Sequence, residues 1–114
     1  MPFNRGDICF VNLDPTVGAE MQKKRRCVIV SSDAIGILPI KIIAPITEWN
    51  PAFENNSWHV KVLPNVKNGL TKVSAIDALQ MRCVDIRRFG SKVGELDLET
   101  MKELTQAIAL VIEI

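Results

Sequence analysis

The sequence contains few of the residues that build metal centres and disulfide scaffolds. It has one histidine and three cysteines, and Cys9, Cys27 and Cys83 lie far apart along the chain. Zinc sites use a full set of nitrogen or sulfur ligands, usually from closely spaced pairs, and disulfide scaffolds use even numbers of cysteines. We therefore expect no metal site and no cofactor, and we interpret all three cysteines as small buried hydrophobic residues of a protein in a reducing compartment.

Long apolar segments are also missing. Residues 1–7 contain no apolar stretch typical of a signal peptide, and the longest apolar runs, residues 35–45 and 107–112, are interrupted or too short to cross a bilayer. The formal net charge is only +1, so the composition gives no global signal for nucleic acid binding, and any such site has to be a local patch. We expect a soluble, cytoplasmic protein with no membrane partner.

The apolar pattern that is present predicts a small domain made mainly of strands. A length of 114 residues is typical of one domain with one hydrophobic core, and we predict a single domain over residues 1–114. A polar, basic loop is expected at residues 16–26 and a connection at residues 87–95. Short apolar or alternating segments predict β-strands at residues 8–13, 27–32, 40–46, 58–62, 70–74 and 75–84.

The last part of the chain has the period of a helix. Asp97 is the expected N-cap, and the apolar residues that follow it form one face. They are Leu98, Met101, Leu104, Ile108 and Val111. The fold class predicted from these elements is mainly β (β+α), a small barrel closed by a C-terminal α-helix.

A basic run and a threonine at the end of a strand are the candidates for chemistry. No glycine-rich phosphate loop, serine-nucleophile signature or acidic metal motif is present. RNA, however, can be cleaved by its own 2′-hydroxyl, which requires neither a protein nucleophile nor a metal ion. An arginine such as Arg25 would stabilise the charge on the phosphorane, and the Thr47 hydroxyl would donate to a nonbridging oxygen. Composition and spacing alone favour the plainer interpretation, a solvated basic loop and an ordinary turn.

Five segments, in order along the chain, resemble the MazF/PemK toxin family. The resemblance covers nearly the whole chain and includes the closing helix at residues 98–111. The matching segments are Arg5-Gly6-Asp7 before a strand, the D-P-x-x-G-x-E pattern of residues 14–20, Arg25 followed by a valine-rich strand ending in Ser32-Asp33, the P-I-T strand end at residues 45–47, and the Q-x-R-x-x-D pattern of residues 80–85.

The resemblance implies an SH3-like barrel, a homodimer and a type II toxin–antitoxin system with a cognate antitoxin protein that blocks the site. It implies a sequence-specific, metal-independent endoribonuclease, an mRNA interferase, that cleaves single-stranded RNA by 2′-OH attack. The products would carry 2′,3′-cyclic phosphate and 5′-OH ends.

The family pattern also implies roles for individual residues. By position, Arg25 is the catalytic arginine and Thr47 the phosphate-stabilising hydroxyl, while Glu20 would order Arg25 or contact RNA. The family has proline after the arginine, whereas this chain has Arg26, so either arginine could reach the phosphate; the register of the flanking motifs favours Arg25. The remaining candidates for RNA binding are Lys24, Arg26, Trp49, Gln80 and Arg82.

Two other functions stay open from the sequence. The alternative from another class is a non-catalytic toxin of the same fold that binds DNA gyrase; such CcdB-type toxins end in tryptophan-glycine-isoleucine, whereas this chain ends in Val-Ile-Glu-Ile. The third is a barrel that binds RNA without cleaving it, which Arg26 in place of proline keeps open. His59 matches no catalytic residue of the family, and its alternating position predicts a surface side chain.

Overall fold

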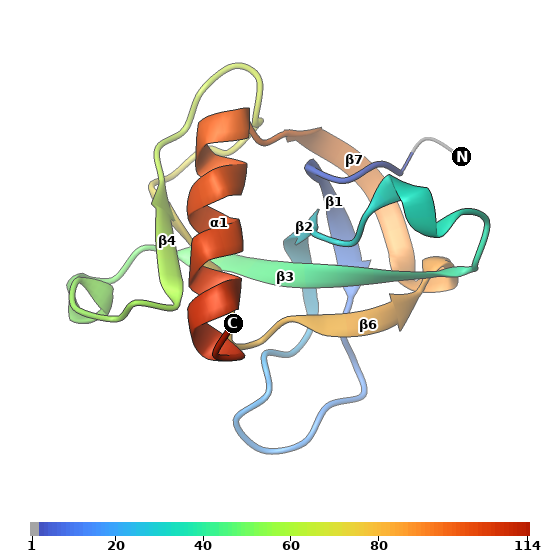
Figure 1. Cartoon of the computed structure of the whole chain (residues 1–114), viewed down its shortest axis with the longest axis horizontal. Helices are drawn as coiled ribbons and strands as arrows, with labels where there is room; N and C mark the ends of the chain where they lie inside the picture. Colours follow the sequence, from blue (N-terminus) through green and yellow to red (C-terminus); the bar gives the residue numbers. More distant parts are fainter. Residues whose placement is uncertain (1–2) are drawn as a thin grey trace.

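The computed structural model describes residues 3–114 as an antiparallel β-sheet with a C-terminal α-helix lying across it (Figure 1). The mainly β class with a C-terminal helix is therefore confirmed. No helix in the described part of the chain has the length and apolar character needed to span a bilayer. The elements in chain order are β1 (Asp7–Asn12), β2 (Lys24–Ile29), η1 (Asp33–Ile35), β3 (Ile40–Glu48), η2 (Pro51–Phe53), β4 (His59–Val62), β5 (Ser74–Asp77), β6 (Arg82–Asp85), η3 (Ile86–Arg88), β7 (Phe89–Glu95) and α1 (Leu98–Val111).

Strand β3 is the centre of the sheet. The strand order is β4-β5-β3-β2-β1-β7, and β6 also pairs with β3. Residues 40–43 of β3 pair with β6, residues 43–45 with β2, and residues 46–48 with β5. Within residues 3–114 no ladder joins β7 to β4 or to β6, so hydrogen bonds do not close the sheet, and a closed barrel stays a prediction.

The two faces of the sheet bury separate apolar clusters, because successive residues of a strand point to opposite sides. Ile8 and Val28 belong to the larger cluster, which packs against α1, while Cys9 and Cys27 belong to the smaller one. Burial raises the pKa of the Cys9 thiol to about 11 and that of Cys27 to about 12, so both stay protonated at neutral pH. Cys83 is exposed on the edge strand β6, and its interpretation as a buried residue is wrong.

Several predicted strands and boundaries differ from the structure. The predicted strand at residues 70–74 is wrong, because residues 70–73 contain a bend and β5 begins only at Ser74. Strand β2 begins at Lys24 rather than Cys27, because the basic residues 24–26 pair with residues 10–12 of β1. The predicted strand at residues 75–84 is two strands, since the Asp77 carboxylate accepts hydrogen bonds from the N–H groups of Leu79 and Gln80 and forms a turn there. The predicted connection at residues 87–95 contains β7, a largely exposed strand whose polar sequence lacks apolar alternation.

His59 is not the surface residue that alternation predicted. Its side chain is only 7% exposed, and its Nε2 lies 3.5 Å from Oδ2 of Asp77 on the neighbouring strand. The loop between β3 and β4 folds over it, so that the ring of Phe53 stacks on the imidazole at 3.9 Å and the Asn56 amide lies 3.2 Å from Nδ1. The loop therefore covers His59, while Lys61 on the same face of β4 remains exposed.

Asp97 begins α1 in the way the sequence predicted, and its contribution can be measured. Its carboxylate accepts a hydrogen bond from the N–H of Thr100 at 2.7 Å, and this bond lowers the pKa of Asp97. Asp97→Ala is expected to lower the free energy of unfolding by about 1 kcal/mol at neutral pH. Because the pKa is lower in the folded state, the stabilisation is present above the ordinary carboxyl pKa and is lost as the pH falls through the folded-state value.

Urea unfolding of the wild type and Asp97→Ala at neutral pH and in acid tests this sign. The difference between the two proteins should shrink below a pH of about 4. A difference that persists unchanged in strong acid would mean that the ionised carboxylate is not its source.

Candidate functional site

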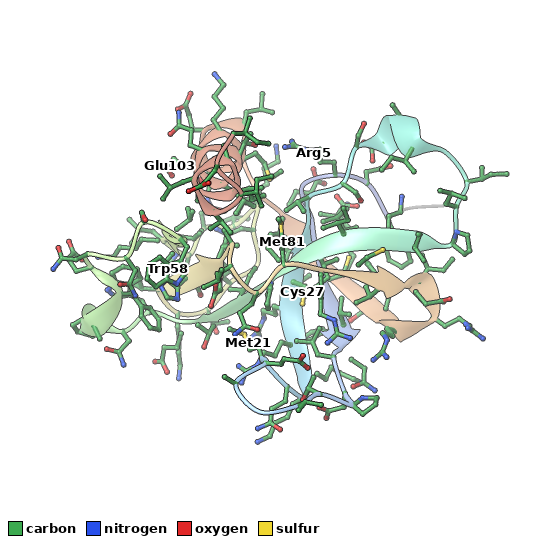
Figure 2. The ribbon with its side chains drawn as sticks, turned by 60° about the horizontal axis from the view of Figure 1, so that its bottom comes forward. Arg5, Met21, Cys27, Trp58, Met81 and Glu103 are labelled. Carbon is green, nitrogen blue, oxygen red and sulfur yellow. The ribbon has the colours of Figure 1, made fainter. Side chains whose placement is uncertain are left out.

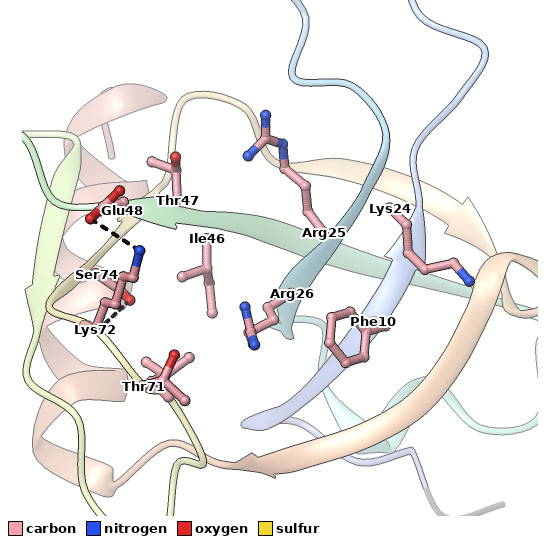
Figure 3. A pocket seen from close by; sticks show the side chains of 11 residues that line it. Phe10, Lys24, Arg25, Arg26, Ile46, Thr47, Glu48, Thr71, Lys72 and Ser74 are labelled. Atoms are coloured by element: carbon pink, nitrogen blue, oxygen red, sulfur yellow. Dashed lines mark hydrogen bonds and ion pairs between the residues drawn. The ribbon is translucent and has the colours of Figure 1, made fainter.

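A hollow of about 290 Å³ opens where β2 begins and β3 ends (Figure 3). We call it the cationic hollow. The predicted residues Lys24, Arg25, Arg26 and Thr47 all line it. The remaining lining residues are Phe10, Ile46, Glu48, Leu70, Thr71, Lys72 and Ser74.

The hollow exists because two neighbouring strands separate. The ladder between β2 and β3 ends at the pair Cys27–Pro45, and proline has no N–H to continue it. Continued in the same register, the next residues on the same face would be Arg25 and Thr47. From Ile46 onward β3 instead pairs with β5 on its other edge. Arg25 and Thr47 are thus left facing an opening, and Figure 3 shows the Arg25 guanidinium on the side of the hollow where Thr47 lies.

The two consecutive arginines are held differently. Arg25 is half-buried, and its Nε donates to the carbonyl oxygen of Gln22 at 2.9 Å. The guanidinium carbon of Arg26 lies 5.1 Å from the centre of the Phe10 ring, and its Nε is buried without a hydrogen-bond partner. Among the described residues, neither arginine forms an ion pair with a carboxylate.

The hollow carries a local excess of positive charge although the whole chain is close to neutral. Lys24, Arg25, Arg26 and Lys72 line it, and Glu48 is its one acidic residue. Glu48 lies 3.7 Å from the Lys72 amine, in a largely exposed pair. The net surplus can attract an anion, and arginine supplies donors in a planar arrangement that suits phosphate oxygens.

Three other predicted residues line a second, adjoining hollow of about 360 Å³, which also includes Pro45 of β3. The Glu20 carboxylate accepts a hydrogen bond from the N–H of Val17 at 2.9 Å and does not contact Arg25. Gln80 accepts from the N–H of Met21 and donates to the carbonyl of Ala19, both at 3.0 Å.

The two hydrogen bonds of Gln80 tie the β1–β2 loop (residues 13–23) to the turn between β5 and β6. Arg82 adds a third link, donating to the Leu13 carbonyl at 3.0 Å. Figure 2 shows Met21 where the loop leaves the sheet, close to Cys27 and Met81. Glu20, Gln80 and Arg82 therefore support the loop in this structure.

Trp49 lies outside both hollows, beyond the end of β3. Its ring contacts Phe53 edge-on at 5.7 Å, and the Lys61 amine lies 4.9 Å from the ring centre. The structure does not bring it together with Arg25 and Thr47, although it follows Thr47 by only two residues.

Several residues of the cationic hollow could not be found in the sequence. Thr71, Lys72 and Ser74 fell within a predicted strand, and no motif marks them. They line the hollow only because β5 pairs with the end of β3, which is a long-range contact. Phe10 alternates with apolar neighbours and gave no sign that a guanidinium would lie over it.

Gln80→Met is expected to loosen the β1–β2 loop without unfolding the protein. The substitution removes both hydrogen bonds to the loop while keeping a side chain of similar length. The amide of Met21 should exchange with solvent about tenfold faster, while global stability falls by less than about 1.5 kcal/mol. Hydrogen exchange followed by NMR measures both, with Gln106→Met on the exposed face of α1 as the control. Unchanged exchange at Met21 would show that other contacts hold the loop.

No three His, Cys, Asp or Glu side chains are grouped within residues 3–114 so as to hold a metal ion. Apart from the Glu48 carboxylate, the polar side-chain groups at the cationic hollow are guanidinium, ammonium and hydroxyl groups, which donate hydrogen bonds to anions.

The arrangement of strands and helix is that of the MazF toxins. MazF from Deinococcus radiodurans superposes with a TM-score of 0.82 at 18% identity, covering 97% of this chain and 96% of that one. An endoribonuclease in complex with its cognate antitoxin, from a mycobacterial species, superposes with a TM-score of 0.77 at 18% identity, covering 97% and 95%.

The sequence comparison extends this from fold to family. Residues 4–112 match the PemK-like, MazF-like toxins of type II toxin–antitoxin systems, and the chain belongs to this family. It is 30% identical over 112 residues to endoribonuclease EndoA of Bacillus subtilis (strain 168), covering 96% of this chain and 94% of that protein. The predicted membership of the MazF/PemK toxins is confirmed, and this relative supports the predicted enzyme class.

Proposed function

We propose that this toxin is a sequence-specific endoribonuclease that cleaves single-stranded RNA without a metal ion. The observation that carries the proposal is the meeting of Arg25, Arg26 and Thr47 at one hollow with a surplus of positive charge. Family membership and the endoribonuclease relative support the enzyme class, and the side chains at the hollow suit a phosphate.

The proposed reaction uses the RNA's own nucleophile. The 2′-hydroxyl loses its proton as its oxygen bonds to the adjacent phosphorus, the bond from phosphorus to the 5′-oxygen breaks, and the departing 5′-oxygen takes up a proton. The products are a 2′,3′-cyclic phosphate and a 5′-hydroxyl. The protein has to stabilise the extra negative charge on the phosphorane, where preorganised donors have their largest effect.

Arg25 and Thr47 are assigned to that task. Their side chains face the opening between β2 and β3 from opposite strands, so a phosphate placed between them would meet donors from both sides. The bond from Arg25 Nε to Gln22 fixes the side chain and leaves the terminal amino groups of the guanidinium for the phosphate. The Thr47 hydroxyl makes no hydrogen bond within residues 3–114 and supplies a further donor.

The other candidates are assigned to binding. Lys24 and Arg26 attract the RNA backbone at the cationic hollow, while Glu20, Gln80 and Arg82 contact nucleotides that extend into the adjoining hollow. Trp49 offers a ring face to an unpaired base farther along the strand. Pro45 of the second hollow is followed directly in β3 by Ile46 and Thr47 of the cationic hollow, which supports a path for the RNA from one hollow to the other.

We also propose that the protein is a homodimer with an SH3-like barrel in each protomer, and that a cognate antitoxin protein blocks the cationic hollow. Structural neighbours that are complexes of MazE with MazF support the antitoxin partner. A positively charged hollow would favour an antitoxin segment that carries carboxylates.

The test is incubation of the purified protein with a long single-stranded RNA in the presence of EDTA. We expect discrete fragments that begin with a 5′-hydroxyl, which a kinase can label directly without prior phosphatase treatment. Activity that EDTA abolishes and added metal restores would overturn metal independence. If no RNA is cut under any condition, a binding role becomes the better explanation, and gyrase inhibition is the next assay.

A further inference from the structure

Arg26 is the one arginine among residues 3–114 whose side chain donates no hydrogen bond to the protein. The others donate to a backbone carbonyl or to a side-chain oxygen, as Arg82 does to Leu13 and Arg87 to Asp85. The Nε of Arg26 is buried and has no partner. A buried donor without an acceptor is unfavourable. The terminal nitrogens of the same guanidinium also have no acceptor among the described residues, and they remain for a ligand in the hollow that Arg26 lines.

The surroundings of Arg26 hold its charge in place without neutralising it. Its guanidinium lies over the Phe10 ring, which favours a cation, and Ile46 and Leu70 line the same hollow. In such partly apolar surroundings an ionic contact is stronger than in bulk water. The nearby carboxylate, Glu48, is already paired with Lys72, so Arg26 keeps its donors for an anion that enters the hollow.

Arg26 cannot share its ligand atom with Arg25. The two residues are adjacent in β2, so their side chains leave opposite faces of the strand. Arg25 lies on the face of Cys27, and Arg26 lies opposite Phe10, on the face of Val28. Figure 3 shows the two guanidinium groups pointing to different parts of the hollow, Arg25 beside Thr47 and Arg26 between Phe10 and Ile46.

We propose that Arg26 forms a second phosphate subsite, which binds the phosphate next to the scissile one in the RNA strand. The hollow then holds consecutive phosphates, one between Arg25 and Thr47 and the next at Arg26. This inference rests on the proposed function, because it takes RNA as the ligand. The family pattern that the sequence resembles has proline at this position, which provides no such donor.

The test combines neutralised phosphates with substitution of Arg26. A short oligoribonucleotide spanning a mapped cleavage site is made uncleavable by a 2′-deoxy sugar at that site, and each phosphate in turn is replaced by an uncharged methylphosphonate. Dissociation constants are measured by fluorescence anisotropy for the wild type, R26Q and R26K. R87Q is the matched control, because it removes an arginine charge in η3 that is exposed and paired with Asp85.

We expect the wild type to lose about tenfold in affinity when a phosphate adjacent to the scissile one is neutralised. R26Q should bind the unmodified strand about tenfold more weakly and should lose nothing further at that phosphate, because the contact is already gone. R26K should retain part of the effect. The slope of log affinity against log salt should fall by about 0.7 in R26Q and stay unchanged in R87Q.

The inference is overturned if the affinity lost in R26Q and the affinity lost on neutralising a phosphate are additive at every phosphate. It is also overturned if the two losses are non-additive only at the scissile phosphate. Either result can occur while the wild type still cuts RNA to 5′-hydroxyl ends, in which case the proposed function stands alone. A wild type that neither cuts nor binds RNA removes both proposals. If R26Q fails to fold, the phosphate series on the wild type and R26K decides, since a real subsite makes R26K less sensitive at one adjacent phosphate.

Discussion

Replacing Arg25 with alanine is expected to slow RNA cleavage by about two to three orders of magnitude. The substitution removes the donors that, in the proposed mechanism, face the charge developing on the phosphorane. The fold should persist, because Arg25 is half-buried near the start of β2 and its side chain makes one hydrogen bond, to the carbonyl of Gln22. We expect the free energy of unfolding to fall by no more than about 1 kcal/mol. Single-turnover cleavage and thermal unfolding, measured on the same preparation, check both parts.

Three further variants separate chemistry from charge. Arg25→Lys keeps the positive charge but loses the planar set of donors, so its rate should stay well below that of the wild type. Thr47→Val removes the hydroxyl with little change in volume and should slow cleavage less than Arg25→Ala. Arg87→Gln removes a charge away from the hollow and should leave the rate unchanged. A fall of many degrees in the melting temperature of Arg25→Ala would make the residue structural.

Gly94→Ala is expected to lower the free energy of unfolding by about 3 kcal/mol. A Cβ atom at Gly94 would lie 2.5 Å from the backbone carbonyl of Asn68 and from the carbonyl oxygen of Lys67. These are backbone atoms, and the Asn68 side chain that fixes them is buried and hydrogen-bonded to the N–H groups of Asn65 and Leu70. The methyl group can therefore be accommodated only if β7 moves away from the turn.

Gly90→Ala in the same strand is the matched control. Its Cβ would lie 3.4 Å from the Cβ of Phe10, an ordinary contact, so stability should change by less than about 1 kcal/mol. Thermal unfolding should show Gly94→Ala roughly 10 °C below the wild type and Gly90→Ala close to it. Equal melting temperatures of the two variants would mean that the turn at Asn68 can move to accommodate the methyl group and that the close backbone approach is not essential.

The elements that the sequence predicted well are those with a strong local pattern. The helix runs over the predicted residues with Asp97 as its cap, because its apolar spacing and capping residue both act within a few positions. The core strands β1 and β3 were found because apolar β-branched residues follow one another there. Strand β7 was missed, since its glycines and exposed polar residues form a strand only when β1 is available as a partner.

The candidate site was predictable in its residue types but not in its geometry. The basic residues 24–26 were expected in a loop, and their pairing with β1 gives Arg25 and Arg26 opposite directions that a loop would not impose. Gln80 was predicted to bind RNA, and nothing in the sequence indicated that its amide also binds the backbone of the β1–β2 loop. Both outcomes depend on contacts between segments far apart in the chain, which no local pattern encodes.

The division of β3 among three partner strands has a consequence for how such a protein can diversify. One continuous backbone sets the positions of β2, β5 and β6 at once, so an insertion within it would displace every wall of the hollow. The loop at residues 49–58 follows the end of β3 and can change in length or composition without altering the spacing between Arg25 and Thr47. The loop at residues 13–23 is more constrained, because the carbonyl of Gln22 holds the Arg25 side chain. Adaptation to a new target sequence is therefore expected in residues 49–58 rather than within β3.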